Sequence, residues 1–246
     1  MPIYILFDTE TTGNQDSDRI IQVGAMIVHS KDHIEVIDEM CSSDEPIKIE
    51  AMEVHNITPE LIANKPPFNQ TTFSQKIETY NTKENYLIAH NINFDLGMLQ
   101  KEGFENKYTL IDTLRCAKHL LPNSPAHRLQ YLRYALELYK IENQEAQKLG
   151  IEIKAHDAIG DVLVMKLLLS HLVKLVQEEY QGVNPMQKLA ELTQIPVLMN
   201  EFKFGKYKNQ SINEIASSDM GYLKWMRNNL ELDEDMKYTL DYYLAN

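Results

Sequence analysis

The stretch "LFDTETTG", residues 6–13, sets two carboxylates, Asp8 and Glu10, at the end of an apolar run. Residues 3–7 predict a buried strand, because they are apolar, few and followed by polar residues. Side chains two positions apart on a strand share a face, so Asp8 and Glu10 are expected to point the same way. Carboxylates this close repel each other unless a cation lies between them or one takes a proton. Taken alone, the pair also fits a solvated strand end.

Composition limits the class of protein. The chain of 246 residues is long for one typical domain and short for two, which predicts one large domain with a small appendage. Two cysteines favour a reduced, cytoplasmic protein and are too few for a thiolate zinc site. No run spans a bilayer and no secretory signal is visible, so no membrane partner is expected. The net charge of −12 argues against a broad basic surface that grips duplex DNA, but not against a local one.

The order of predicted elements indicates an α/β fold. Strands are predicted at residues 3–7, 20–28, 33–40, 86–89 and 109–111. Helices are predicted at 68–80, 93–103, 113–121 (with Asp112 as its cap), 128–139, 158–180 and 186–194, with short helical pieces in 47–63. A change in composition predicts a first domain at 1–181, a linker with a short helix at 182–200 and a small module at 201–246. Open α/β sheets bind ligands at the carboxyl ends of strands, where Asp8 and Glu10 lie.

Two later segments supply further acids. Asp95 follows the predicted strand at 86–89, near a helix start, where an acid also favours the helix dipole. The stretch "HDAIGD" supplies His156, Asp157 and Asp161 at the start of the long helix. Asp157 suits the N-cap, with its side chain free to accept a backbone N–H. Asp161 lies a turn further in among apolar residues, so capping does not explain it.

Together these positions resemble the motifs of the DEDDh 3′–5′ exonuclease family. The matching motifs are Asp8-x-Glu10, Asp95 and His156-x-x-x-x-Asp161, and the resemblance spans roughly residues 3–180. The resemblance implies a ribonuclease-H-like mixed sheet flanked by helices. It also implies two Mg²⁺ or Mn²⁺ ions, with Asp8 bridging both, Glu10 and Asp161 completing one site and Asp95 serving the other. In the same way it implies that His156 is the general base.

Neighbours of these acids are candidates for substrate binding. They are Thr11, Thr12, Gly13, His55, Asn91 and Phe94. The first three follow the strand, where backbone N–H groups and a small residue permit close approach of a terminal nucleotide. Phe94 either stacks on a base or belongs to the core. His55 aligns with a segment that lines the 3′-end pocket in family members, and it fits an ordinary loop histidine equally well.

Residues 202–230, "FKFGKYKNQSINEIASSDMGYLKWMRNNL", resemble the C-terminal module of the bacterial exodeoxyribonuclease X family. Lysines alternate there with aromatic residues, a pattern that suits contact with nucleic acid. We expect the aromatic residues to form the core of the module itself. DNA contacts are expected from Lys203, Lys206 and Lys208, although acids at 231 and 233–235 dilute the positive charge.

The leading hypothesis is a metal-dependent 3′–5′ exodeoxyribonuclease. It would release 5′-mononucleotides from the 3′ ends of single-stranded or frayed duplex DNA, in DNA repair. The alternatives are a 3′–5′ exoribonuclease that trims RNA, a proofreading polymerase subunit, and an inactive nucleic-acid-binding adaptor. The appended module argues against a bare oligoribonuclease, and the presence of all five catalytic positions argues against the adaptor.

Overall fold

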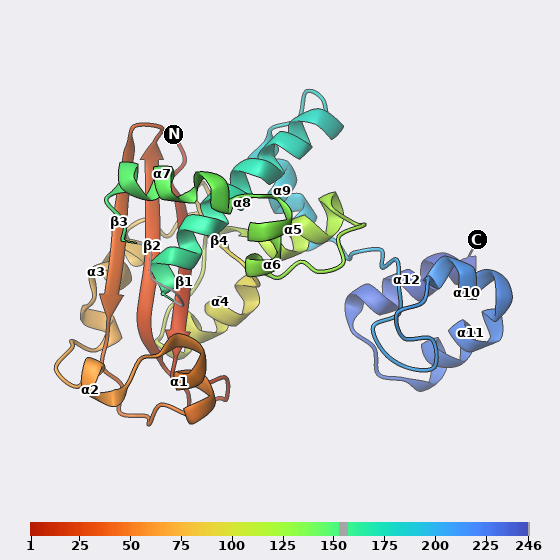
Figure 1. The fold of residues 1–246 in the computed structure, drawn as a ribbon, viewed down its shortest axis with the longest axis horizontal. Helices are drawn as coiled ribbons and strands as arrows, with labels where there is room; N and C mark the ends of the chain where they lie inside the picture. Colours follow the sequence, from red (N-terminus) through yellow and green to blue (C-terminus); the bar gives the residue numbers. More distant parts are fainter. Residues whose placement is uncertain (153–156, 246) are drawn as a thin grey trace.

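The computed structural model describes residues 1–152 and 157–245. Within these residues a mixed sheet has the strand order β3-β2-β1-β4-β5 (Figure 1). The strands are β1 (Tyr4–Thr11), β2 (Ile20–Ser30), β3 (His33–Met40), β4 (Tyr86–Ala89) and β5 (Thr109–Asp112). The first three form an antiparallel meander, whereas β4 and β5 run parallel to β1. The predicted α/β class is therefore confirmed.

Helices cover both faces of this sheet. They are α1 (Ile49–His55), α2 (Pro59–Ile62), α3 (Thr72–Thr79), α4 (Ile92–Lys101), α5 (Thr113–Leu120), α6 (Leu129–Ala135), α7 (Tyr139–Leu149), α8 (Ala158–Glu179) and α9 (Pro185–Gln194). The predicted cap of α5 is confirmed, because the Asp112 carboxylate accepts hydrogen bonds from the backbone N–H groups of Leu114 and Arg115. The region predicted as one helix at 68–80 begins with a 3₁₀ turn, Phe68–Gln70, before Thr71 caps α3.

One helix prediction is wrong. Residues 128–139 form α6 and the start of α7 rather than a single helix, and α7 was not predicted. Glu137 has a φ of 56°, in the left-handed region, so the helix cannot continue through it. The buried Leu132 and Leu138 on either side of this turn both pack against α8 in the same core cluster. The apolar residues that predicted one helix therefore belong to two short helices, and both of these pack against α8.

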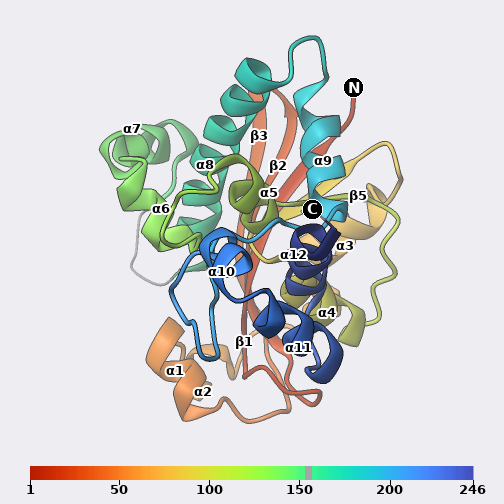
Figure 2. The ribbon, with the colours of Figure 1, turned by 90° about the vertical axis from the view of Figure 1, so that its right-hand side faces the viewer.

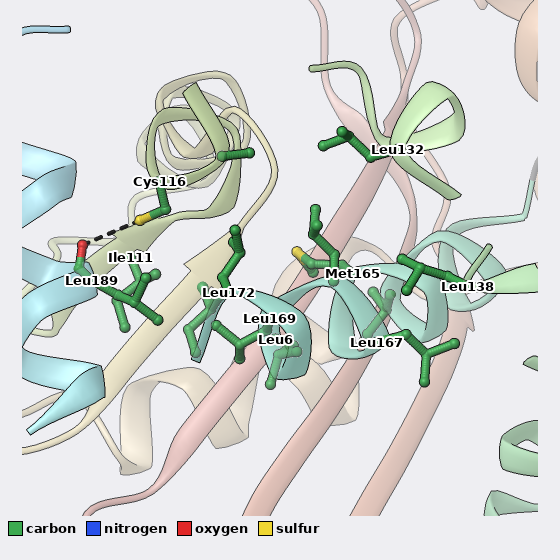
Figure 3. Packing of buried hydrophobic residues seen from close by; sticks show 14 of the residues in the cluster. Leu6, Ile111, Cys116, Leu132, Leu138, Met165, Leu167, Leu169, Leu172 and Leu189 are labelled. Atoms are coloured by element: carbon green, nitrogen blue, oxygen red, sulfur yellow. Dashed lines mark hydrogen bonds between the residues drawn. The ribbon is translucent and has the colours of Figure 1, made fainter. Parts of the chain in front are cut away.

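Alternation along β1 divides the core into two clusters. Ile5 and Phe7 are buried on the face covered by α3 and α4. Leu6 is buried on the opposite face, with α8, and Figure 3 shows it with Cys116 of α5 and Leu189 of α9 in the same cluster. The Cys116 thiol donates to the Leu189 carbonyl at 3.3 Å. Both cysteines are free, and burial raises the pKa of each thiol to about 12, which keeps them protonated.

The C-terminal helices are α10 (Ile212–Ser218), α11 (Met220–Asn229) and α12 (Glu234–Ala245). Figures 1 and 2 show them as a body joined to the sheet by the chain after α9. Their own core includes Phe202, Leu223 and Leu240. Within the predicted linker, α9 packs on β5, α5 and α8. The division into 1–181, 182–200 and 201–246 therefore stays a proposal, with α9 belonging to the first core.

None of the helices in residues 1–152 and 157–245 combines the length and apolar character that crossing a bilayer requires.

Candidate active site

Asp8 and Glu10 lie on the face of β1 that α8 covers. The strand continues past residue 7, where the sequence prediction ended it, because β2 pairs with it as far as Thr11. Asp8 lies opposite Gly24, and Glu10 lies opposite Gln22. Residues 6, 8 and 10 share a face, so the carboxylates extend the row that begins with the buried Leu6.

Gly24 brings the start of α8 against the sheet. A Cβ at this position would lie 2.4 Å from the Ala158 carbonyl carbon and 2.4 Å from the Ile159 nitrogen. Only glycine permits two backbones to approach this closely. Asp161, one turn into α8, is thereby held near Asp8, and its charge raises the pKa of the Asp8 carboxyl.

Asp95 reaches the same place from the opposite face of the sheet. β4 pairs with β1 only along residues 4–6, so the β1 edge beyond that point is open on this side. The Asp95 Oδ1 atom fills the opening by accepting hydrogen bonds from the Thr9 N–H at 3.1 Å and the Thr9 hydroxyl at 2.7 Å. Thr9, between the two acids of the first motif, therefore positions the third acid, and it was missed by the sequence analysis.

The site crowds four carboxylates together, of which Asp95 is buried and Asp8, Glu10 and Asp161 are partly buried. Burial raises the pKa of Asp8 well above its usual value, and the charges of Asp95, Asp161 and Glu10 raise it further. Burial, followed by the charges of Asp161, Asp95 and Asp157, raises the pKa of Glu10 to about 8. Burial also raises the pKa of Asp95 to about 7, against the hydrogen bonds from Thr9 that lower it. The sequence-predicted acids are thus brought together.

This donor set fits hard divalent cations. All four side chains offer carboxylate oxygens, the ligands that Mg²⁺ and Mn²⁺ prefer. Their mutual repulsion, visible in the raised pKa values of Asp8 and Glu10, is what a bound cation would relieve. The residues present therefore suit a metal site made by Asp8, Glu10, Asp95 and Asp161.

Polar side chains of α6 form a hydrogen-bond network that orients the Asp161 carboxylate. The Gln130 amide donates to the Asp161 Oδ1 atom at 2.6 Å, and Arg133 donates to the Gln130 Oε1 atom at 3.2 Å. Arg133 is itself fixed by two hydrogen bonds, of 2.6 and 2.9 Å, to the buried carboxylate of Glu142. No motif in the sequence pointed to Gln130, because its role depends on how α6 packs on α8.

The predicted capping role of the Asp157 side chain is wrong. Asp157 occupies the N-cap position of α8, but its carboxylate makes no capping hydrogen bond. Instead its Oδ1 atom accepts from the Gln22 amide at 2.6 Å, and the same amide donates to Asp38 at 2.9 Å. The buried Gln22 therefore ties the beginning of α8 to β2 and β3. His156, the predicted base, lies outside the described residues.

Comparison with known proteins agrees with this geometry. A sequence profile described as exonuclease matches residues 5–169, and one described as exodeoxyribonuclease X-like C-terminal matches residues 202–231. Exodeoxyribonuclease 10 of Escherichia coli K12 is 30% identical over 246 residues, which span 98% of this chain and 98% of that protein. The chain belongs to the exonuclease family. It is a nuclease, and enzymes of this family depend on divalent metal ions.

Solved structures share the fold of this exonuclease. Exonuclease X in complex with 5′ overhanging duplex DNA superposes with a TM-score of 0.57 at 24% identity, covering 77% of this chain and 99% of that one. A zinc-bound complex of E. coli exonuclease I with single-stranded DNA gives a TM-score of 0.52 at 20% identity, covering 78% and 42%. The predicted ribonuclease-H-like sheet flanked by helices is therefore confirmed.

Several predicted substrate-binding residues of the exonuclease are engaged inside the protein. The Thr11 hydroxyl donates to the Gly13 carbonyl at 2.7 Å, and the Thr12 hydroxyl donates to the buried Asp18 at 3.0 Å. A Cβ on Gly13 would lie 2.6 Å from an oxygen of Asp18 and 2.7 Å from Lys48. The small size of Gly13 is thus needed to close the loop that follows β1.

The His55 side chain is buried and uncharged. Its Nδ1 atom accepts the Ile57 N–H at 3.0 Å, so Nε2 carries the proton and donates to the Thr11 carbonyl at 3.2 Å. Burial lowers the pKa of His55, which keeps the ring uncharged. His55 therefore fastens the end of α1 to the end of β1, beside the acids.

Asn91 and Phe94 lie at the start of α4. Asn91 is the N-cap, with a φ of 74°, and its N–H donates to the Asp112 carboxylate at 3.0 Å. Phe94 is 38% exposed, so the alternative that placed it in the core is wrong. Its contact with a base stays a prediction.

The predicted residues of the C-terminal module fall into two groups, aromatic residues of its core and lysines. Phe202 is fully buried and contacts the rings of Tyr207 and Tyr222, as expected for a core of the module's own. Lys203 pairs with Glu201 at 2.5 Å, and Lys206 pairs with Asp219 at 3.2 Å. These pairs reduce the positive charge that two of the three predicted DNA-contacting lysines present. Lys208 follows them in a turn, with its N–H donating to the Gly205 carbonyl.

Proposed function

We propose that this exonuclease removes nucleotides one at a time from the 3′ end of DNA and releases them as 5′-mononucleotides, in DNA repair. The observation that carries the proposal is the convergence of four acids from β1, α4 and α8, in which the charges of Glu10, Asp95 and Asp161 all raise the pKa of Asp8. Similar proteins support the choice of DNA: the E. coli relative is named an exodeoxyribonuclease, and two structural neighbours hold DNA.

The four acids would hold two ions, Mg²⁺ or Mn²⁺. Asp8 would contribute to both sites, Glu10 and Asp161 to one, and Asp95 to the other. When bound, the ions neutralise the acids and stabilise the negative charge that develops on the phosphoryl oxygens of the scissile bond. Thr9 keeps Asp95 at the edge of β1, and Gln130 orients Asp161, so both carboxylates are positioned before substrate arrives.

His156 would supply the general base, since it precedes Asp161 by five residues and an imidazole titrates near neutral pH. It takes a proton from a water molecule whose oxygen forms the new bond to phosphorus. The bond from phosphorus to the 3′ oxygen of the penultimate nucleotide breaks, and that oxygen takes up a proton. The products are a strand shortened by one nucleotide and a 5′-mononucleotide.

Substrate contacts would come from the residues around the acids and from the module. The exposed ring of Phe94, one residue before Asp95, would stack on a terminal base without selecting sequence. Single-stranded or frayed 3′ ends suit this contact, because an unpaired terminal base can turn toward the ring without breaking base pairs. Of the three lysines, Lys208 would contribute most to a phosphate contact, since Lys203 and Lys206 already pair with acids.

The test is degradation of a 5′-labelled single strand with Mg²⁺, made once as DNA and once as RNA of the same sequence. The proposal expects a ladder that shortens from the 3′ end of the DNA, with mononucleotides as the other product. Asp161→Asn is the matched control, since it keeps the side-chain shape but removes a charged ligand. It should abolish cleavage and leave unfolding cooperative.

Three results would count against the proposal. Faster loss of the RNA would identify an exoribonuclease, and internal cuts would identify an endonuclease. Full-length DNA and RNA at the end of the reaction, with the Asp161→Asn protein binding both as wild type does, would leave only the adaptor.

A further inference from the structure

A second group of metal-ligating side chains lies on the hairpin formed by β2 and β3. His29, His33 and Glu35 each offer one ligand atom, and these atoms lie within 4.8 Å of one another. Glu35 of β3 pairs with Ile27 of β2, which pairs with Ile5 of β1, so Glu35 lies two strands to the side of Asp8 and about 10 Å from it along the strand direction. Glu35 also bonds to Lys76 of α3, on the face of the sheet opposite to that of Asp8.

The backbone explains why the three side chains meet. His33 and Glu35 are two residues apart on β3 and share a face. The register of β2 against β3 shifts between Val28 and Ser30, which leaves His29 as an extra residue on β2. A bulge of this kind re-aims the side chain that it carries. The rings of His29 and His33 stack, with centroids 4.5 Å apart and planes inclined by 20°.

Residues from the α3 side support two of the three ligands. The His29 Nε2 atom lies 2.6 Å from the Glu35 Oε1 atom, while the other Glu35 oxygen accepts from the Lys76 ammonium at 2.9 Å. The edge of the Tyr80 ring packs against His29, with centroids 5.7 Å apart. Such outer contacts orient a ligand before the metal binds. His33 is exposed, which leaves the group open to solvent on one side.

We propose that His29, His33 and Glu35 bind one divalent ion of the zinc class, with water completing the coordination. Two imidazole nitrogens and one carboxylate oxygen form a donor set that suits Zn²⁺ and its neighbours in the first transition row. Mg²⁺ prefers oxygen ligands alone, so this site and the acidic site select different ions.

Metal binding displaces a proton. The short contact between the His29 Nε2 and Glu35 Oε1 atoms holds one proton, and the ion takes its place while the proton passes to solvent or to the His29 Nδ1 atom. With ordinary zinc–ligand bond lengths the two atoms separate from 2.6 Å to about 3.3 Å. The charged and titratable groups that face this change are His33 and Lys76, with Tyr80 beside them. The bound ion links β2 to the edge strand β3 and stabilises the hairpin, independently of the nuclease reaction.

The test is calorimetric titration of Zn²⁺ into full-length protein carrying Asp8→Ala and Asp161→Ala, which removes ligands of the acidic site. Into this background His33→Ala is introduced, because an exposed side chain can be removed without disturbing the core. His171→Ala, which removes a histidine of α8 on the other face of the sheet, is the matched control. Glu35→Gln provides a second variant that keeps the side-chain shape.

The expected result is one zinc ion bound by the background protein and by the His171→Ala protein. His33→Ala and Glu35→Gln should each weaken this binding by at least about tenfold. Zinc should also raise the unfolding temperature of the background protein but not that of His33→Ala. Equal zinc affinity in the His33→Ala and His171→Ala proteins would overturn the proposal, as would the absence of zinc binding in the background protein.

Discussion

Replacing Gly24 by alanine tests how the fold sets the distance between β2 and α8. The added Cβ would lie 2.4 Å from the Ala158 carbonyl carbon and the Ile159 nitrogen, whereas ordinary van der Waals contact begins at 3.4 Å. Both neighbouring atoms belong to the backbone, so no side chain can rotate away. The strand and the helix must therefore separate by about 1 Å.

Two consequences follow from that separation. Overpacking costs about 1–3 kcal/mol, and we expect about 3 kcal/mol here because a whole helix has to move. In a protein of this size such a loss lowers the unfolding temperature by about 6–12 °C. Asp161 moves with α8, away from Asp8, and a misplacement of about 1 Å in a catalytic group can cost about a hundredfold in rate.

The assay combines urea unfolding, followed by circular dichroism, with initial rates on a labelled single-stranded DNA. Gly97→Ala is the matched control: a Cβ there meets nothing within 4 Å, and within α4 alanine should stabilise by up to about 1 kcal/mol. Equal urea midpoints and equal rates of DNA degradation in the Gly24→Ala and Gly97→Ala proteins would contradict the role of Gly24 in setting this distance.

Four further outcomes are expected. The metal-free protein should lose stability as pH rises from about 4.5 to about 8, because Glu10 binds its proton more tightly in the folded state, where its pKa is about 8. Thermal unfolding in EDTA at a series of pH values measures this loss. The Glu10→Gln substitution should flatten the dependence of the unfolding temperature on pH. Asp112→Ala should lower the free energy of unfolding in urea by about 2–3 kcal/mol, because a buried carboxylate that accepts three backbone N–H groups is lost. Asn184→Ala, at the more exposed cap of α9, should lower it by only about 1 kcal/mol. Gln130→Ala should slow cleavage by about threefold to tenfold and weaken Mn²⁺ binding in calorimetry, because Asp161 loses the amide that orients it; unchanged Mn²⁺ affinity would contradict this role. His156→Ala should slow turnover by on the order of a hundredfold while Mn²⁺ still binds, and an unchanged rate at neutral pH would rule out the base assignment.

Several strands and one helix cap of this protein could be predicted from residues that are close together in the chain. The strands at 33–40 and 86–89 and the cap at Asp112 follow from short-range patterns, and they occur as predicted. Alternation along β1 also placed Asp8 and Glu10 on one face before any tertiary contact was known. These features depend on neighbours within a few residues, which is the range over which periodicity and capping act.

Packing decided what the sequence could not. One predicted helix became α6 and α7 because the chain turns at Glu137, where both neighbouring segments reach α8. The Asp157 carboxylate bonds to Gln22 rather than to its own helix, since β2 presents that amide at the same point.

Local patterns in the chain are enough to identify the acids of this protein and to place two of them on one strand face. The approach of Asp95 and Asp161 to this pair depends instead on how distant elements pack. A shortened β4 leaves the Thr9 edge open to Asp95, and the missing side chain of Gly24 lets α8 carry Asp161 to the sheet. Both depend on contacts between residues far apart in the chain, and no pattern within one segment reports them.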